Sequence, residues 1–276
     1  MNTVCGLHLM PLLEEIDSPR RSCIAQFTAH GRLRSLSFVQ ADNEIMDAIP
    51  APVSHIVVDA PLEVHNETGA RPIERLLGWL DVAAFPHSRE RDRQIFGGTR
   101  GDALRAPLTT RIAHVAETHP DAVLKQLLWE HRPEHAHSIV EFADYRSYWH
   151  PLRPPRYRPK AGGRAATNGF ASIVAILERE VDLDGWAPTE SPDDWQAIED
   201  AAALDALICA IVAWRWAYRP GATLQVSSGH TPFIFASDAF LGHRISLHAE
   251  RTGVSVREDF QDPHTAGPRA DVPPPD

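Results

Sequence analysis

The sequence predicts an α/β fold in which a mixed, mostly parallel sheet carries helices on both faces. Residues 22–28 and 33–39 are two strand-like runs joined by a short turn, which is the pattern of a β-hairpin. Residues 55–58 (HIVV) form a short, largely apolar run, typical of a strand buried on both faces. Residues 201–217 form an apolar helical run with no polar face, so this helix must pack against the sheet. Strands that alternate with helices after a hairpin predict this layered architecture.

The first half of the chain supplies four further elements. Residues 3–9 alternate between outward and inward positions and predict a first strand. Residues 42–49 predict a short helix that Pro50 stops. Residues 71–80 predict a second helix, and residues 85–105 predict a loop rich in Gly and Arg.

The second half continues the alternation of strand and helix. Residues 111–116 predict a strand, and residues 121–129 a helix. Residues 171–181 and 197–218 have helical spacing, and residues 233–235 predict a short last strand. Neither a dinucleotide fingerprint nor a phosphate loop occurs in the sequence, so it gives no support to those two nucleotide-binding classes.

The elements predict one domain over residues 1–245. Residues 131–165 are rich in Pro, His and Arg and weakly patterned, which predicts an insertion in that domain. Residues 246–276 form a C-terminal extension, and from residue 265 its Pro-rich composition predicts disorder.

Composition and charge limit the cellular locations and the classes of binding partner that we expect for the protein. The net charge of −10 is unusual for a nucleic-acid binder, although two arginine clusters, at residues 89–100 and 153–164, could contact phosphate. No apolar run approaches the ~20 residues that span a bilayer. The N-terminus lacks the pattern of a signal peptide. The odd number of three widely spaced cysteines predicts reduced thiols, and hence a cytoplasmic location without membrane association.

Acidic residues follow two of the predicted strands. Asp59 ends the HIVV strand, and Glu117 ends the strand before it reaches Pro120. Functional groups of open α/β sheets gather outside the carboxyl ends of the strands, so both acids are candidate site residues. Helix capping is the alternative role. It does not suit Asp59, because the next predicted helix begins only near Arg71, but it stays open for Glu117.

A third acid, Asp205, lies inside the apolar helix. A buried carboxylate is costly unless it is paired, bound to a metal or kept neutral, and Arg215 is too far along the helix to pair with it. Three carboxylates are hard oxygen ligands, so Asp59, Glu117 and Asp205 predict a Mg²⁺ or Mn²⁺ site. A pair of such ions would clamp the oxygens of a phosphodiester. Without metal, the clustered acids are expected to repel one another.

Several segments together resemble domain-of-unknown-function family 429, whose members are predicted nucleases with an RNase H-like fold. The matching segments are VVDAPL at residues 57–62, the Gly69-x-Arg71-x-x-Glu74 motif, ETHP at residues 117–120 and LDALICAIVA at residues 204–213. The resemblance covers roughly residues 1–245 and implies a mixed five-stranded sheet, three antiparallel strands then two parallel, with helices on both faces. It also places Asp59, Glu117 and Asp205 on the acidic positions of the family.

The sequence departs from the RNase H-like pattern in its first strand. Those enzymes carry a metal-binding aspartate where this chain has His8, in the segment Gly6-Leu7-His8. An imidazole can hold a divalent ion but brings no negative charge and favours softer metals than Mg²⁺.

Two functions follow for such a chain. The first is a metal-dependent nuclease or phosphodiesterase that acts on nucleic acid or a nucleotide. Asp59, Glu117 and Asp205 would bind the metal, with His8 as an auxiliary ligand or proton carrier, and Arg71 and Lys160 would contact phosphate. The alternative is a catalytically inactive RNase H-like domain that serves as a binding or scaffold subunit.

Overall fold

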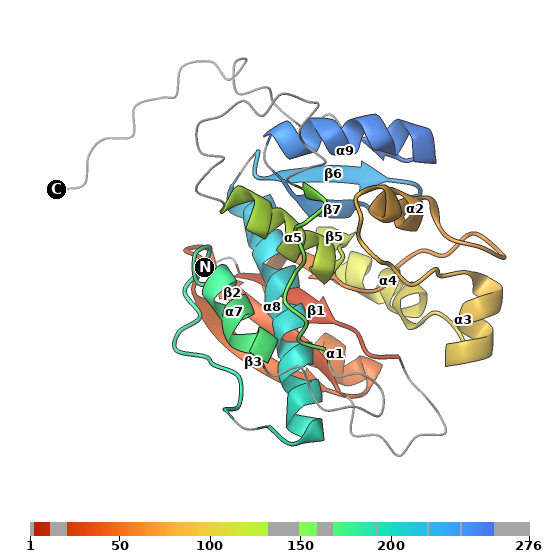
Figure 1. The fold of residues 1–276 in the computed structure, drawn as a ribbon. Coiled ribbons are helices and arrows are strands. Elements are labelled where there is room, and N and C mark those ends of the chain that lie inside the picture. Colours follow the sequence, from red (N-terminus) through yellow and green to blue (C-terminus); the bar gives the residue numbers. More distant parts are fainter. Residues whose placement is uncertain are drawn as a thin grey trace, which may run out of the picture.

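The computed structural model describes residues 3–11, 21–131, 149–158, 168–190, 192–219, 221–237 and 239–256. Within these residues the fold is α/β, with one mixed sheet of eight strands (Figure 1). The spatial order is β3-β2-β1-β4-β5-β7-β6-β8. The strands are β1 (Thr3–His8), β2 (Ser22–Thr28), β3 (Leu33–Val39), β4 (Val53–Val58), β5 (His114–Glu117), β6 (Thr223–Ser227), β7 (Phe233–Ala236) and β8 (Ser255–Val256).

The first five strands have the predicted pairing, and the sheet is larger than predicted. β1, β2 and β3 are antiparallel neighbours, and β4 and β5 continue the sheet parallel to β1. The expectation of five strands is wrong because β7, β6 and β8 extend the sheet beyond β5. The sequence did not predict β6 and β8. β8 has only two residues, and β6 is a short strand of five residues near the edge of the sheet.

Helices cover both faces of the sheet (Figure 1). One face packs against α5, α7 and α8, and the other against α1 and α4. α2 and α9 contact each other near β6 and β7. The helices are α1 (Asp42–Ala48), α2 (Pro72–Trp79), α3 (Arg89–Phe96), α4 (Arg100–Arg111), α5 (Pro120–Glu130), α7 (Asn168–Leu177), α8 (Asp194–Tyr218) and α9 (Ala239–Thr252).

The segment predicted as a Gly- and Arg-rich loop is helical. Ser88 accepts a hydrogen bond from the backbone N–H of Arg91 at the start of α3, and Gly97 ends that helix with a φ of 74°. α4 then continues to Arg111, the residue at which the next strand was expected to begin. The charges of α3 hide the helix from a hydrophobic-periodicity argument, and its cap residues are the better signal.

The structure describes only part of the predicted insertion and of the predicted C-terminal extension. Residues 149–158 of the predicted insertion are described, and Trp149 and Tyr157 within them are buried. The rest of the insertion beyond residue 131, and the Pro-rich tail from residue 265, lie outside the described residues. The predicted boundary at residue 245 falls inside α9, and β8 after it pairs with β6.

The long helix α8 lies across the centre of the sheet (Figure 1). Asp193 caps its N-terminus by accepting hydrogen bonds from the backbone N–H groups of Trp195 and Gln196. At the other end the buried Arg215 pairs with Glu130 and Glu180, with N–O distances of 2.8 and 2.6 Å. Arg215 therefore belongs to an ion-pair cluster of its own, away from Asp205.

Among the described helices, none is both long and apolar enough to cross a membrane.

Candidate metal centre

The parallel pairing of β1 with β4 brings His8 and Asp59 together at the carboxyl ends of two central strands. The backbone N–H of Asp59 donates to the carbonyl of Leu7 over 3.1 Å, which continues the ladder past the strand end. Asp59 Oδ1 accepts a hydrogen bond of 2.9 Å from the backbone N–H of Leu9, and its Oδ2 bonds to His8 Nδ1. His8 Nε2 lies 3.0 Å from Met10 Sδ, so Nδ1 is the nitrogen turned toward the carboxylate.

Gly6 lets α8 approach closely enough to add Asp205 to this pair. A Cβ atom at Gly6 would lie 2.1 Å from the backbone oxygen of Ala206 and from the backbone nitrogen of Ala210. Only hydrogen fits there, so β1 touches the backbone of α8 directly. His8 lies two residues along the same face of β1, and its Nδ1 is 3.6 Å from Asp205 Oδ2. His8, Asp59 and Asp205 each offer a ligand atom within 4.8 Å of the others.

Asp205 is held by two further side chains that sequence reasoning missed. Arg158 Nε donates to Oδ2 over 3.0 Å and Nη2 to Oδ1 over 2.7 Å, and the hydroxyl of Tyr157 donates to Oδ1. Arg158 Nη1 also donates to both carboxylate oxygens of Asp121, at 3.0 and 3.1 Å. The carboxylate of Asp205 is thus fully paired by these side chains, and a metal ion would have to share it with Arg158 or displace that residue.

Glu117 lies beside this group but is bonded elsewhere. Its Oε2 pairs with Arg71 Nη1 at 2.9 Å, and its Oε1 accepts hydrogen bonds from the backbone N–H groups of Leu62 and Glu63 at 2.7 and 3.3 Å. Arg71 also pairs with Glu74 at 2.7 Å. Glu117 therefore stands outside the three-residue group, and the guanidinium of Arg71 is engaged by acids of the protein. Lys160 lies outside the described residues.

One cavity of about 210 Å³ connects all the described candidates. Its lining includes the three-residue group together with Glu117 and Arg71, and it also includes Arg158. Asp59, Glu117 and Asp205 all line this cavity, but only Asp59 and Asp205 belong to the three-residue group, and both Glu117 and Asp205 are paired with arginines.

The charges in the cavity compensate one another. Burial alone would lower the pKa of His8, but the carboxylates of Asp59 and Asp205 outweigh burial and raise the pKa above its usual value. Burial would raise the pKa of Asp205, and the ion pair with Arg158 reverses this effect and lowers the pKa. The expectation of acids that only repel one another is therefore not met, because Arg158 pairs with Asp205, Arg71 pairs with Glu117, and His8 Nδ1 contacts Asp59.

Two histidines of the cavity were not singled out from the sequence. His87 Nδ1 lies 3.0 Å from the buried carboxylate of Asp92, whose other oxygen accepts a hydrogen bond of 2.8 Å from Thr99. The contact with Asp92 engages the Nδ1 of His87, so the Nε2 of His87 is the nitrogen left to exchange a proton. His119 follows β5, and its buried Nδ1 has no hydrogen-bond partner among the described residues. His119 lies in the ETHP segment, where only Glu117 was given a role, and His87 lies in the segment predicted as a loop, so neither histidine was singled out.

The donor set fits a divalent ion of intermediate softness. Two carboxylates and one imidazole suit Mn²⁺ or Zn²⁺ better than Mg²⁺, which prefers oxygen ligands alone. The residues present therefore fit a metal centre in kind and in spacing.

Comparison with family models, with curated proteins and with solved structures found no match for this chain.

Proposed function

We propose that the protein is a divalent-metal-dependent phosphodiester hydrolase of RNase H-like fold that acts on nucleic acid or a nucleotide. The observation that carries this proposal is the group of His8, Asp59 and Asp205, with ligand atoms within 4.8 Å of one another. The group lines a cavity at the carboxyl ends of β1 and β4, where active sites of open α/β sheets form. The three cysteines are buried and unpaired, which supports a reducing, cytoplasmic location.

The sheet order supports the RNase H-like part of the proposal. Strands β3-β2-β1-β4-β5 give three antiparallel strands followed by two parallel ones, as the resemblance to that fold implies. α8 lies against β1 and carries Asp205 at its apolar centre. The additional strands β7, β6 and β8 extend this core at one edge.

Five residues that line the cavity have a chemical role in this proposal. Asp59, Asp205 and His8 would hold the ion, which supplies positive charge to the phosphate and lowers the pKa of water. His87, fixed by Asp92, would carry a proton to or from the reacting oxygens through its Nε2. The guanidinium of Arg158 pairs with Asp205, and it would pair with the phosphate instead when the ion binds to Asp205.

A second candidate function is a non-catalytic binding subunit. It is favoured by the pairing of Asp205 with Arg158 and of Glu117 with Arg71, which neutralises both acids without any metal. A domain that keeps the fold but has replaced ion binding by internal ion pairs would show this arrangement.

Cleavage assays with His8→Asp separate the two functions. Parent and variant are incubated with single-stranded, duplex and hybrid substrates, with Mg²⁺ and with Mn²⁺. We expect Mn²⁺-dependent cleavage by the parent, a loss of at least about 100-fold in Asp59→Asn, and a gain of Mg²⁺-dependent cleavage in His8→Asp. Asp184→Asn, at an exposed acid far from the cavity, is the control and should match the parent. If neither parent nor His8→Asp cleaves any substrate, the binding subunit is the correct function.

A further inference from the structure

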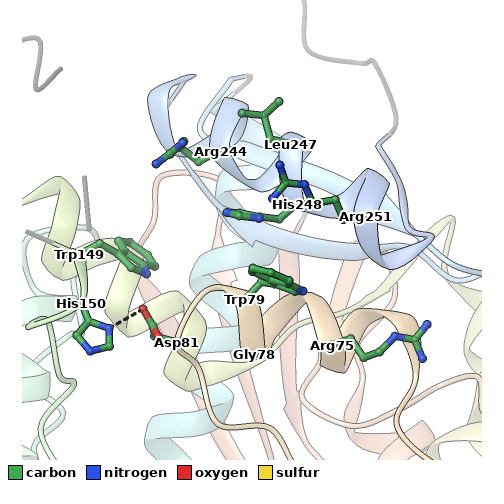
Figure 2. A pocket seen from close by; sticks show the side chains of 10 residues that line it. All are labelled: Arg75, Gly78, Trp79, Asp81, Trp149, His150, Arg244, Leu247, His248 and Arg251. Atoms are coloured by element: carbon green, nitrogen blue, oxygen red, sulfur yellow. Dashed lines mark hydrogen bonds and ion pairs between the residues drawn. The ribbon is translucent and has the colours of Figure 1, made fainter. Parts of the chain in front are cut away.

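A second, larger cleft lies between α2 and α9. Its volume is about 980 Å³, and Figure 2 shows Trp79 on α2 below His248 and Arg251 on α9, with Arg75 to one side. The ring of Trp79 stacks on His248 with a centroid distance of 5.4 Å, yet Trp79 remains 51% exposed. Unlike the similarly exposed Trp195, Trp79 lines a cleft together with arginines, so its open ring and these positive charges lie in one place. We call this region the Trp79 cleft.

The Trp79 cleft continues toward the candidate metal centre. A neighbouring cleft of about 630 Å³ shares Gly78 and Asp81 with it. That neighbouring cleft in turn shares Arg158 with the cavity of His8, Asp59 and Asp205. The three cavities are therefore neighbours that share lining residues, with the 630 Å³ cleft between the other two.

The charge of the two outer clefts is opposite to that of the whole chain. Their lining includes seven Lys and Arg residues but only two Asp residues, whereas the chain as a whole has 27 Lys and Arg against 37 Asp and Glu. Such a concentration of positive charge in an acidic protein gives a local attraction for anions.

Four of these arginines keep their charge available. Arg75, Arg153, Arg156 and Arg251 are exposed, and none of them forms an ion pair within the described part of the chain. Arg75 donates to the backbone carbonyls of Ala70 and Thr252, and Arg153 to backbone carbonyls as well, so these contacts position the guanidinium groups without neutralising them.

We infer that the Trp79 cleft and its neighbour bind a single strand of nucleic acid, with a base stacked on Trp79 and phosphates held by Arg75, Arg251, Arg153 and Arg156. Exposed aromatic rings together with a basic groove are the two features by which proteins hold single strands without reading their sequence. A peptide could also use aromatic and arginine contacts, but the local positive charge favours a polyanion. That the strand leads into the metal cavity rests on the proposed function; binding to the cleft does not.

Binding is measured by fluorescence anisotropy with a fluorescein-labelled oligothymidylate of about 20 nucleotides, in EDTA so that no metal contributes. We expect Trp79→Ala to weaken binding roughly ten-fold, because one stacked base is lost. The double variant Arg75→Ala/Arg251→Ala should weaken binding and reduce the slope of log K against log salt by about 0.7 for each phosphate contact removed.

Matched controls come from exposed residues outside both clefts. Trp195 is 48% exposed, and Arg34 and Arg179 are exposed arginines. Trp195→Ala and Arg34→Ala/Arg179→Ala should bind like the parent. The inference is wrong if the parent does not bind the oligonucleotide, if the controls weaken binding equally, or if AMP or a duplex of equal length binds as tightly. A protein that binds the strand in EDTA but binds no Mn²⁺ retains this inference and loses the proposed metal function.

Discussion

Gly6→Ala is expected to destabilise the protein by more than about 3 kcal/mol, or to prevent folding. The new Cβ would lie 2.1 Å from backbone atoms of Ala206 and Ala210, and backbone atoms of a helix cannot move aside as a flexible side chain can. Relief of the clash requires α8 to shift away from β1, which opens the central core. Urea denaturation followed by circular dichroism measures the change in the free energy of unfolding.

Gly78→Ala is the matched control for this experiment. Gly78 lies in α2 with no atom within 4 Å of the added Cβ. Alanine favours a helix over glycine by about 1 kcal/mol, so Gly78→Ala should equal or exceed the parent in stability. Equal stabilities of Gly6→Ala and the parent would contradict the close contact of β1 with α8, and with it the placement of Asp205 beside His8.

Arg158→Met is expected to cost about 2 kcal/mol of stability without metal, less than the loss of a fully buried partner, because the Arg158 side chain is 40% exposed to solvent. Asp205 has a side chain only 3% exposed, and the variant leaves its carboxylate with one fewer cation in a buried site. A double-mutant cycle with Asp205→Asn isolates the pair, because Arg158→Met should cost much less once the charge on residue 205 is gone. Stability is again measured by urea denaturation.

Arg32→Met serves as the control for the loss of an arginine. Arg32 pairs with Asp184, but both side chains are largely exposed, at 60% and 49%. Exposed ion pairs contribute less than about 1 kcal/mol, so this variant should remain close to the parent. A cost for Arg158→Met no larger than that of Arg32→Met would show that Asp205 does not depend on this guanidinium.

Part of the site could be predicted from the sequence because position alone identifies it. Asp59 ends a buried strand and Asp205 interrupts an apolar helix, and both features are visible in the order of residues. His8 was identified through the resemblance, because it stands where the RNase H-like pattern has a metal-binding aspartate. Periodicity and turns, which are local signals, predicted most of the first five strands, whereas their order in the sheet was implied by the resemblance to the RNase H-like family.

The partners of these residues could not be predicted. Arg158 and Tyr157 reach Asp205 from a Pro- and Arg-rich segment without periodicity, and Arg71 reaches Glu117 across 46 residues of chain. Such pairings depend on three-dimensional packing and leave no pattern in the sequence. The Trp79 cleft likewise combines α2 with α9, which are far apart in the chain.

The central claim is that His8, Asp59 and Asp205 bind a divalent ion, and pulsed electron paramagnetic resonance of the Mn²⁺-loaded protein tests it most directly. The method detects the ¹⁴N coupling of an imidazole bound to Mn²⁺. We predict one bound Mn²⁺ with an imidazole coupling that disappears in His8→Ala, no bound Mn²⁺ in Asp59→Asn, and an unchanged signal in the control Asp184→Asn. Absence of bound Mn²⁺ in the parent, or a coupling that persists in His8→Ala, would contradict the claim.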